Sequence, residues 1–491
     1  MKTLSILLAL GIAIASAQAA KPKSHKAPTP EPSATPVADT LDRTHPPAAG
    51  PLPAIAFPDA VSETLPNGLT VFVLPIHKAP TVTFRLLVKS GDVFDGNKPG
   101  LAALTADLLN KGTEELSASE FAKKTDFLGI SVEAGSSDDA LSVTASGLSC
   151  YSDEILGFLR DAALRPAFRQ EEVDKEKHKT ISSLAQKKMD PEDLAVRLRD
   201  KLLYGEHPYG AYATPESVQS ITREDLVKFR AAHFLPENAT LVVVGDVETA
   251  TVLAQVKESF GDWKFGGIPN SVPVLAPFPE IRGISVAVVD RPGSVQSNIL
   301  VAGRGIAKNN PDVPELSVVN SVLGGGMSGR LAENLREKHG FTYGSSSGFS
   351  AKKLGGAFSA GAEVRNEVTG AAVQEILNEL KRISSEPIPE SELALQRNLL
   401  VGNFLMSVEN EKRMGERLQE IDLYGLPADF YKTYAAKVAG LGPEKASELA
   451  QKYIDPNDLV IIAVGEAKEI VPQLEKLGKV TVYDTDLKVV R

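Results

Sequence analysis

The 491-residue sequence contains a single cysteine, Cys150. One thiol can form neither an internal disulfide nor a thiolate zinc cluster, so disulfide scaffolds and cysteine-rich zinc domains are excluded. Because Cys150 ends a segment of alternating apolar and polar residues, we expect it to be a buried structural thiol. Excess positive charge is also missing. The net charge of -10 argues against binding to a nucleic-acid backbone, which requires clustered lysine and arginine.

Histidines that could share a metal ion are scarce. No two of the seven histidines lie within one helical turn of each other. A catalytic zinc ion needs three protein ligands and one open position for water. The local sequence therefore offers no zinc site, and only histidines converging from distant segments would provide one.

Long apolar runs are absent beyond the N-terminus. Lys2, the apolar run Leu4–Ala15 and the triplet Ala17-Gln18-Ala19 predict a secretory signal peptide over residues 1–19. The apolar run is shorter than the ~20 residues that a membrane-spanning helix needs. We therefore expect a secreted protein, in the periplasm of a bacterium, with no membrane span in the mature chain.

Four segments follow the predicted signal peptide. Residues 20–55 are rich in proline and alanine and predict a flexible tether. The rest is internally duplicated with a period of about 215–220 residues. A Gly/Pro-rich linker, residues 266–283, separates an N-terminal domain at 56–265 from a C-terminal domain at 284–491.

The duplication is visible in matching strands and helices. Each half begins with two apolar strands, continues into a helix and ends with a β-branched strand that starts at Asn and closes on Gly. The paired strands are Leu69–Leu74 with Ile284–Val289, Thr81–Val88 with Gln296–Ala302, and Asn238–Val247 with Asn457–Ala467. Helical periodicity covers Leu101–Asn110, Glu171–Lys188, Glu315–Leu323 and Glu390–Met414. This pattern predicts an α+β fold of two domains, each a mostly antiparallel sheet covered by helices.

One segment of the first half carries a recognisable motif with its chemistry missing. Gly100–Thr113 reads GLAALTADLLNKGT and resembles the segment that carries His-x-x-Glu-His in the pitrilysin/insulinase peptidases, the M16 family. By this alignment the family's two histidine ligands fall on Ala103 and Asp107, and its general-base glutamate falls on Ala106. A further glutamate ligand of the family falls at or near Ser183. One carboxylate cannot hold zinc usefully, so we expect no metal or other cofactor in this chain.

The second half keeps another element of the same family. Leu323–Ser350 reads LGGGMSGRLAENLREKHGFTYGSSSGFS, which resembles the Gly-rich turn, helix and strand of the family's non-zinc domain. The resemblance implies that Arg336 and Tyr343 bind the substrate carbonyl and the developing oxyanion. It also implies a substrate-binding loop at Gly324, Gly325 and Gly326. Structural alternatives stay open: a solvated helix charge for Arg336, a core position for Tyr343, and a tight turn for the glycines.

Together these resemblances imply a fold of the pitrilysin/mitochondrial-processing-peptidase type (LuxS/MPP-like metallohydrolase) and a two-subunit enzyme of the M16B type. In this hypothesis the chain has no independent peptidase activity. It is the non-catalytic subunit of a heterodimeric zinc metalloendopeptidase that degrades peptides, and zinc is held by a homologous partner subunit that carries His-x-x-Glu-His. The alternative is a stand-alone or homodimeric, non-enzymatic peptide-binding or scaffold protein of the same fold.

Overall fold

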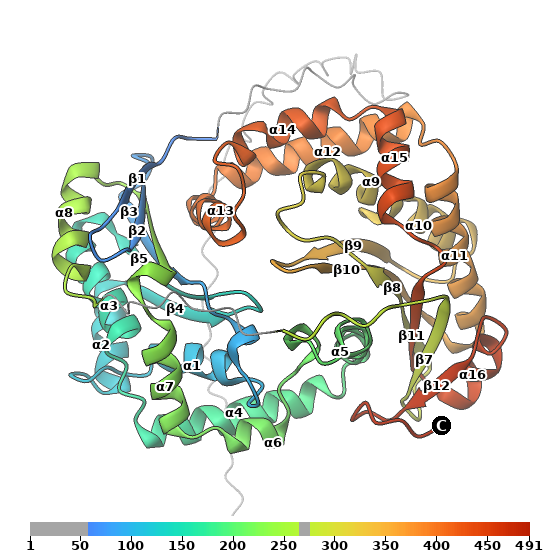
Figure 1. Ribbon diagram of the computed structural model, residues 1–491, viewed down its shortest axis with the longest axis horizontal. Helices are drawn as coiled ribbons and strands as arrows, with labels where there is room; N and C mark the ends of the chain where they lie inside the picture. The colour runs from blue at the N-terminus through green and yellow to red at the C-terminus, as the bar shows by residue number, and fades with distance from the viewer. Residues whose placement is uncertain (1–56, 265–274) are drawn as a thin grey trace, which may run out of the picture. The chain divides into compact units, whose positions relative to one another are not determined.

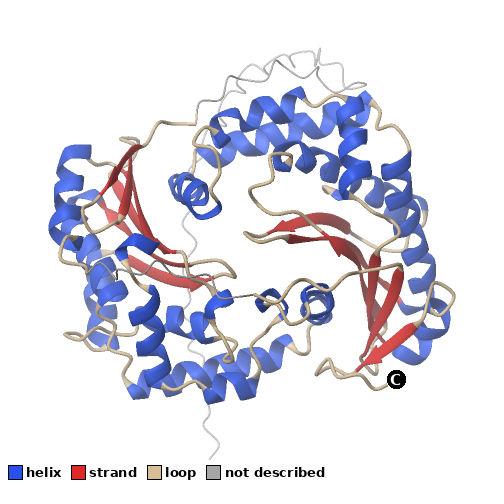
Figure 2. Cartoon of the chain, viewed as in Figure 1, coloured by secondary structure: helices blue, strands red, loops and turns tan. Residues whose placement is uncertain are grey.

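The computed structural model describes residues 57–264 and 275–491. The described chain contains two six-stranded sheets with helices packed on them (Figures 1 and 2). The predicted signal peptide, the predicted tether and residues 266–274 of the predicted linker lie outside the described residues. None of the helices in the described ranges is long and apolar enough to cross a bilayer.

The two sheets share one strand order. The first runs β1-β2-β6-β3-β5-β4, and the second runs β12-β7-β11-β8-β10-β9. The pair β2–β6 is parallel in the first sheet, and its counterpart β7–β11 is parallel in the second, as is the edge pair β7–β12. The strands are β1 Val61–Thr64, β2 Thr70–Pro75, β3 Thr81–Val88, β4 Ser131–Ser136, β5 Leu141–Leu148, β6 Ala239–Gly245, β7 Ile284–Asp290, β8 Gln296–Arg304, β9 Ser345–Ala351, β10 Gly356–Arg365, β11 Leu459–Gly465 and β12 Val480–Tyr483. The predicted α+β fold of two domains is confirmed, and in each sheet most of the strand pairs are antiparallel.

The central strands β6 and β11 are buried along their whole length. Both are continuous apolar runs, which is typical of strands covered on both faces. Helix α13 (Glu411–Tyr424), from the second half, packs on β6, whereas α5 (Pro191–Tyr204), from the first half, packs on β8 and β11. The two halves therefore exchange helices, and each half completes the core of the other.

The remaining helices cover the outer faces and ends of the sheets. Helices α3 and α8 contact the first sheet, and α11 and α16 contact the second (Figure 1). The α-helices not yet given are α1 Leu101–Leu109, α2 Ala118–Leu128, α3 Ser152–Leu164, α4 Gln170–Lys187, α6 Pro215–Ser220, α7 Arg223–His233, α8 Thr249–Phe260, α9 Val313–Gly324, α10 Arg330–Ala332, α11 Thr369–Ser385, α12 Glu390–Val408, α14 Phe430–Gly440, α15 Pro443–Tyr453 and α16 Ala467–Leu474. Short 3₁₀ turns η1 Asp92–Phe94, η2 Ser149–Tyr151, η3 Pro208–Gly210, η4 Pro236–Asn238 and η6 Asn366–Val368 and the π-helical η5 Glu333–Lys338 complete the set.

One predicted helix is two. The periodicity over 390–414 continues past a break between α12 and α13, where Asn410 caps α13 by accepting a hydrogen bond from the backbone N–H of Arg413. A side-chain oxygen at this position satisfies an amide that the helix itself leaves unpaired. The break matters because it redirects the chain and sends α13 onto the first sheet.

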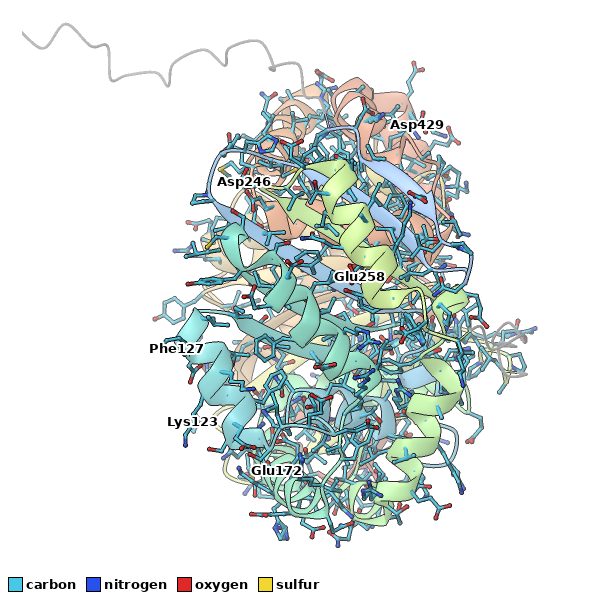
Figure 3. All side chains as sticks on the ribbon, turned by 90° about the vertical axis from the view of Figure 1, so that its left-hand side faces the viewer. Lys123, Phe127, Glu172, Asp246, Glu258 and Asp429 are labelled. Carbon is cyan, nitrogen blue, oxygen red and sulfur yellow. The ribbon has the colours of Figure 1, made fainter. Side chains whose placement is uncertain are left out.

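The prediction of a buried thiol is wrong. Strand β5 ends at Leu148, and Cys150 lies in the following 3₁₀ turn with its side chain exposed. Alternation along a strand says nothing about a residue that comes after the chain has turned. Phe127 of α2 is also exposed, to 88%, and lies at the left edge of the view in Figure 3.

Candidate functional site

Helix α1 presents the degenerate zinc motif. Asp95 precedes the helix and accepts hydrogen bonds from the backbone N–H groups of Gly100 and Ala102, at 2.6 and 2.7 Å. Ala103 is partly buried and Ala106 is only 1% exposed. Residues three and four apart share a helix face, so the turn that should bind metal presents two methyl groups and the carboxylate of Asp107.

A lysine supplies positive charge beside this turn. Helix α4 packs against α1 and carries the buried Glu176, whose Oε1 accepts a 2.6 Å hydrogen bond from Lys179 Nζ. This hydrogen bond raises the pKa of Lys179, to which the charge of Asp107 also contributes. Although Asp107 reaches solvent, desolvation by the surrounding protein raises its pKa, and the nearby charge of Glu176 raises it further.

Ser183 is exposed and lies on α4, two turns after Glu176. The sequence interpretation did not single out Glu176 or Lys179. The signal for this ion pair was the spacing of three residues between Glu176 and Lys179 on a predicted helix, which places the two side chains on one face.

These residues do not fit a catalytic zinc ion. Zinc in proteins is bound by cysteine sulfur, histidine nitrogen and carboxylate oxygen, usually from at least three side chains. Within residues 57–264 and 275–491, no group of three or more His, Cys, Asp or Glu side chains is placed to hold a metal ion. The ammonium group of Lys179 would also repel a divalent cation placed beside Glu176.

The predicted oxyanion-binding pair lies at the surface of the second half. Arg336 belongs to η5 and its side chain is 39% exposed. Its Nη1 lies 3.1 Å from the sulfur of Met327, and its Nε lies 3.5 Å from a carboxylate oxygen of Glu337. Gly340 ends this helical segment in a left-handed conformation with φ +62°.

Tyr343 follows in the loop before β9 and is 92% exposed. The alternative that it fills the core is wrong, because almost all of its surface meets solvent. Strand β9 begins two residues after it, at Ser345. An exposed phenol and a half-exposed guanidinium both present N–H or O–H donors to an approaching ligand.

The Gly-rich loop has structural reasons for its glycines. Gly324 ends α9, and a Cβ at this position would come within 2.5 Å of the backbone nitrogen of Ser347 in β9. Gly326 has φ +115°, a conformation that other residues rarely adopt. Gly325 lines a cavity of about 550 Å³ between α9, α12 and β9. The loop is therefore both a tight turn and one wall of a cavity.

Two family models cover most of the described chain. The model for insulinase (peptidase family M16) matches residues 71–213, and the model for the peptidase M16 inactive domain matches residues 220–400. The chain belongs to the M16 peptidase family. In this M16 protein, Ala103, Ala106 and Asp107 occupy the positions that align with His-x-x-Glu-His.

Relatives of this M16 protein have two kinds of name. An uncharacterized zinc protease of Mycobacterium leprae is 27% identical over 367 residues, covering 74% of this chain and 82% of the relative. The non-peptidase homolog YmxG of Helicobacter pylori is 24% identical over 397 residues, covering 80% of this chain and 91% of the relative.

Two solved structures share the fold. The peptidase M16 inactive domain of Pseudomonas fluorescens superimposes with a TM-score of 0.76 at 24% identity, covering 83% of this chain and 98% of that structure. A protease of Helicobacter pylori gives a TM-score of 0.78 at 21% identity, with coverages of 83% and 99%. At this level of identity the similarity establishes the architecture of this M16 protein.

Proposed function

We propose that this chain is the non-catalytic subunit of a two-subunit zinc peptidase. A homologous partner that carries His-x-x-Glu-His holds the metal, and this chain contributes Arg336 and Tyr343 to bind the substrate carbonyl and the developing oxyanion. The supporting observation is the 92% exposure of Tyr343. A tyrosine that makes so little contact with its own fold contributes little to stability, so a role toward a ligand explains its position better than packing does.

Two regions of the chain have a chemistry consistent with these roles. They are the turn of α1 beside α4, and the segment from η5 to β9. The turn of α1 lacks the ligands that would activate water. Donors that meet an oxyanion as it forms stabilise the transition state, and removing one typically lowers turnover by about 10²–10³-fold. The name of one relative, a non-peptidase homolog, supports a non-catalytic chain, and the zinc proteases among the relatives are the kind of protein that would supply the metal.

The test is reconstitution with a homologous chain that has an intact zinc motif, encoded in the same organism. The mixture should hydrolyse unstructured peptides, whereas this chain alone should not. Tyr343→Phe should lower turnover of the mixture by about 10²-fold without changing complex formation in size-exclusion chromatography. Tyr151→Phe, at a partly buried tyrosine in η2, is the control and should leave turnover unchanged.

An unchanged rate in Tyr343→Phe would contradict the assignment of this residue. Purification of a homodimer that binds peptides and never associates with a zinc-bearing relative would instead support the scaffold alternative. The expected export is tested separately. N-terminal sequencing of the protein from a periplasmic fraction should begin at Ala20, and a chain that retains Met1 would contradict the predicted cleavage.

A further inference from the structure

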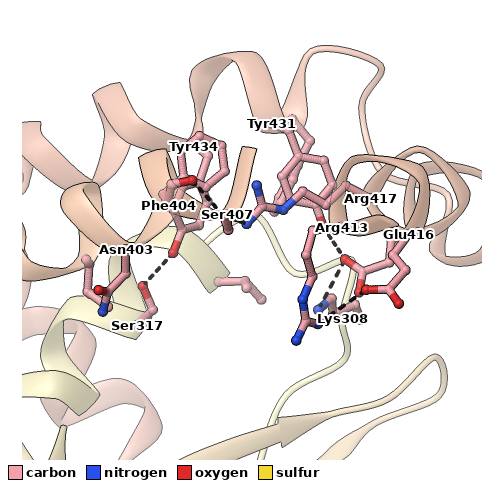
Figure 4. Close-up of a pocket in the computed structure, with 14 residues that line it drawn as sticks. Lys308, Ser317, Asn403, Phe404, Ser407, Arg413, Glu416, Arg417, Tyr431 and Tyr434 are labelled. Carbon is pink, nitrogen blue, oxygen red and sulfur yellow. Dashed lines mark hydrogen bonds and ion pairs between the residues drawn. The ribbon is translucent and has the colours of Figure 1, made fainter. Parts of the chain in front are cut away.

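A second cavity lies among helices that the proposed reaction does not use. It encloses about 500 Å³ between α12, α13, α14 and the segment that leads into α9 (Figure 4). Its walls include the rings of Phe404, Phe430, Tyr431 and Tyr434. This volume lies within the range of small-ligand sites, which combine apolar walls with a few placed polar groups.

Arg417 forms part of the wall and has an unusual environment. Its Cζ lies 4.4 Å from the ring centre of Phe404 and 5.3 Å from that of Tyr431, so the guanidinium contacts two aromatic rings. Its Nη2 donates a hydrogen bond to Ser407 Oγ (Figure 4). Its Nη1 is buried and has no hydrogen-bond partner. Cation–π contacts hold the group in place but bring no negative charge.

The two carboxylates of the cavity contact residues other than Arg417. Glu420 accepts a hydrogen bond from the hydroxyl of Tyr431 and lies 3.6 Å from Lys308 Nζ. Glu416 accepts a 3.2 Å hydrogen bond from Arg413.

Three cations therefore face two carboxylates: Lys308, Arg413 and Arg417 against Glu416 and Glu420. Across the described residues, no carboxylate lies within 4.0 Å of the Arg417 guanidinium. The charge of Glu420 acts on Arg417 only from beyond contact distance, and the lining holds one more cation than carboxylates. Because an unpaired cation in a partly desolvated site is costly, a ligand that brings a negative charge would be favoured there.

We propose that this cavity binds the C-terminal residue of a peptide. Its free carboxylate supplies the missing negative charge toward Lys308 and Arg417, and its aromatic or branched aliphatic side chain lies against the rings of Phe404 and Tyr434. A ligand with one negative charge and an apolar body matches both properties of the walls. Carboxylates are the anions that guanidinium groups recognise most readily in proteins, together with phosphates.

The neighbouring cavity favours a peptide over a fatty acid. The 550 Å³ cavity shares the lining residues Lys308, Ser317 and Asn403 with this one, so the two cavities are adjacent. The polar side chains of Asn403 and Ser350, which make no hydrogen bond within the described residues, line it. Peptide amides can pair with such groups, whereas an alkyl chain would leave them without partners. Neither Arg336 nor Tyr343 lines these two cavities, so the assignment does not rest on the proposed function.

The experiment uses the mature chain without a partner. Isothermal titration calorimetry compares acetyl-Ala-Ala-Phe bearing a free C-terminal carboxylate with the same peptide as its C-terminal amide. The acid should bind, and the amide should bind at least about tenfold more weakly because it carries no charge. Arg417→Met should weaken binding of the acid by a similar factor and leave binding of the amide unchanged.

Two further variants distinguish a loss of binding from a loss of folding. Arg413→Gln removes a cation whose side chain is 67% exposed, so it should weaken binding of the acid while leaving the fold intact. Arg197→Gln, at an arginine that contacts the ring of Tyr212 in a different cavity, should leave binding unchanged. Equal affinity for acid and amide, or binding of palmitate but not of the peptide acid, would overturn the assignment, as would the absence of any binding. None of these results depends on peptidase activity.

Discussion

Lys179 Nζ donates a 2.6 Å hydrogen bond to Glu176 Oε1, one turn away on α4 and beside the degenerate zinc turn of α1. Glu176 is 5% exposed, whereas the Lys179 side chain is 71% exposed. The lysine therefore brings an ammonium group from solvent to a carboxylate that the fold has buried. In this region the ammonium group of Lys179 contacts the buried Glu176, and its charge also acts on Asp107.

Lys179→Met should destabilise the protein by about 1–3 kcal/mol, because it leaves the buried carboxylate of Glu176 without its hydrogen-bond donor. Urea unfolding at pH 7 measures the change. Lys175→Met on the same helix is the matched control, since Lys175 is 74% exposed and 3.6 Å from Glu172. This contact is longer than the Lys179–Glu176 hydrogen bond, and its lysine is exposed, so the control should change stability by less than about 1 kcal/mol. Equal effects of the two substitutions would contradict the assigned role of Lys179.

Gln419 joins α13 to the first sheet. This fully buried side chain donates hydrogen bonds to the backbone oxygens of Arg85 and Thr240, at 2.7 and 3.0 Å, and accepts one from the Arg85 guanidinium. Gln419→Leu should destabilise the protein by about 2–4 kcal/mol, because it removes the acceptor of the Arg85 guanidinium and two further hydrogen bonds of a fully buried side chain. Chemical unfolding with a probe in each half should still give one shared transition, since the exchanged helices couple the two cores.

The exposed Arg413 on the same helix provides the control. Arg413→Gln removes one 3.2 Å contact with Glu416 and should change stability by less than about 0.5 kcal/mol. If Gln419→Leu were equally mild, or if the two halves unfolded in separate transitions, the exchange of helices would not be the link between the domains.

Asp95 makes stability depend on pH. Burial raises the pKa of this carboxyl to about 7, against which its bonds to the amides of Ala102, Gly100 and Leu101 act only in part. Since the folded-state pKa lies above the unfolded value, the native state binds more protons between about pH 4 and 7, and stability falls as pH rises through that window. Each carboxyl group of this kind changes the free energy of unfolding by up to about 1.4 kcal/mol per pH unit within its window.

Asp95→Asn should therefore flatten the fall in unfolding free energy between pH 5 and pH 7. It should also lower stability at every pH, because an amide cannot accept hydrogen bonds at both positions. Asp92, whose pKa burial raises to about 6, contributes in the same direction and remains in the variant. Asp126→Asn, at an exposed site in α2, should keep the wild-type slope. A slope unaffected by Asp95→Asn would rule out this carboxyl as a source of the dependence.

The sequence predicts the sheets better than it predicts their surroundings. The β-branched runs of β6 and β11 identify both central strands, and their unbroken apolar character already indicates burial on two faces. The apolar face of α13 shows only that this helix is buried. This apolar face cannot show that α13 packs on β6, a strand more than 160 residues earlier in the chain.

The candidate sites divide in the same way. The loss of the zinc motif at Ala103, Ala106 and Asp107 is readable from the sequence, because three positions of one helical turn decide it. The cavity at Arg417 is not readable, because Lys308, Phe404 and Tyr431 come together from three separate segments. The exposure of Tyr343 distinguishes between its two interpretations, and no local sequence pattern distinguishes a surface tyrosine from a buried one.

Zinc analysis tests the central claim most directly. The mature chain, expressed without any homologous partner and dialysed against micromolar zinc, should contain far less than one zinc ion per chain by plasma emission spectroscopy. It should also cleave no peptide. The complex with a partner that has an intact zinc motif should contain one zinc ion and be active. Stoichiometric zinc and peptide cleavage by the isolated chain would contradict the account.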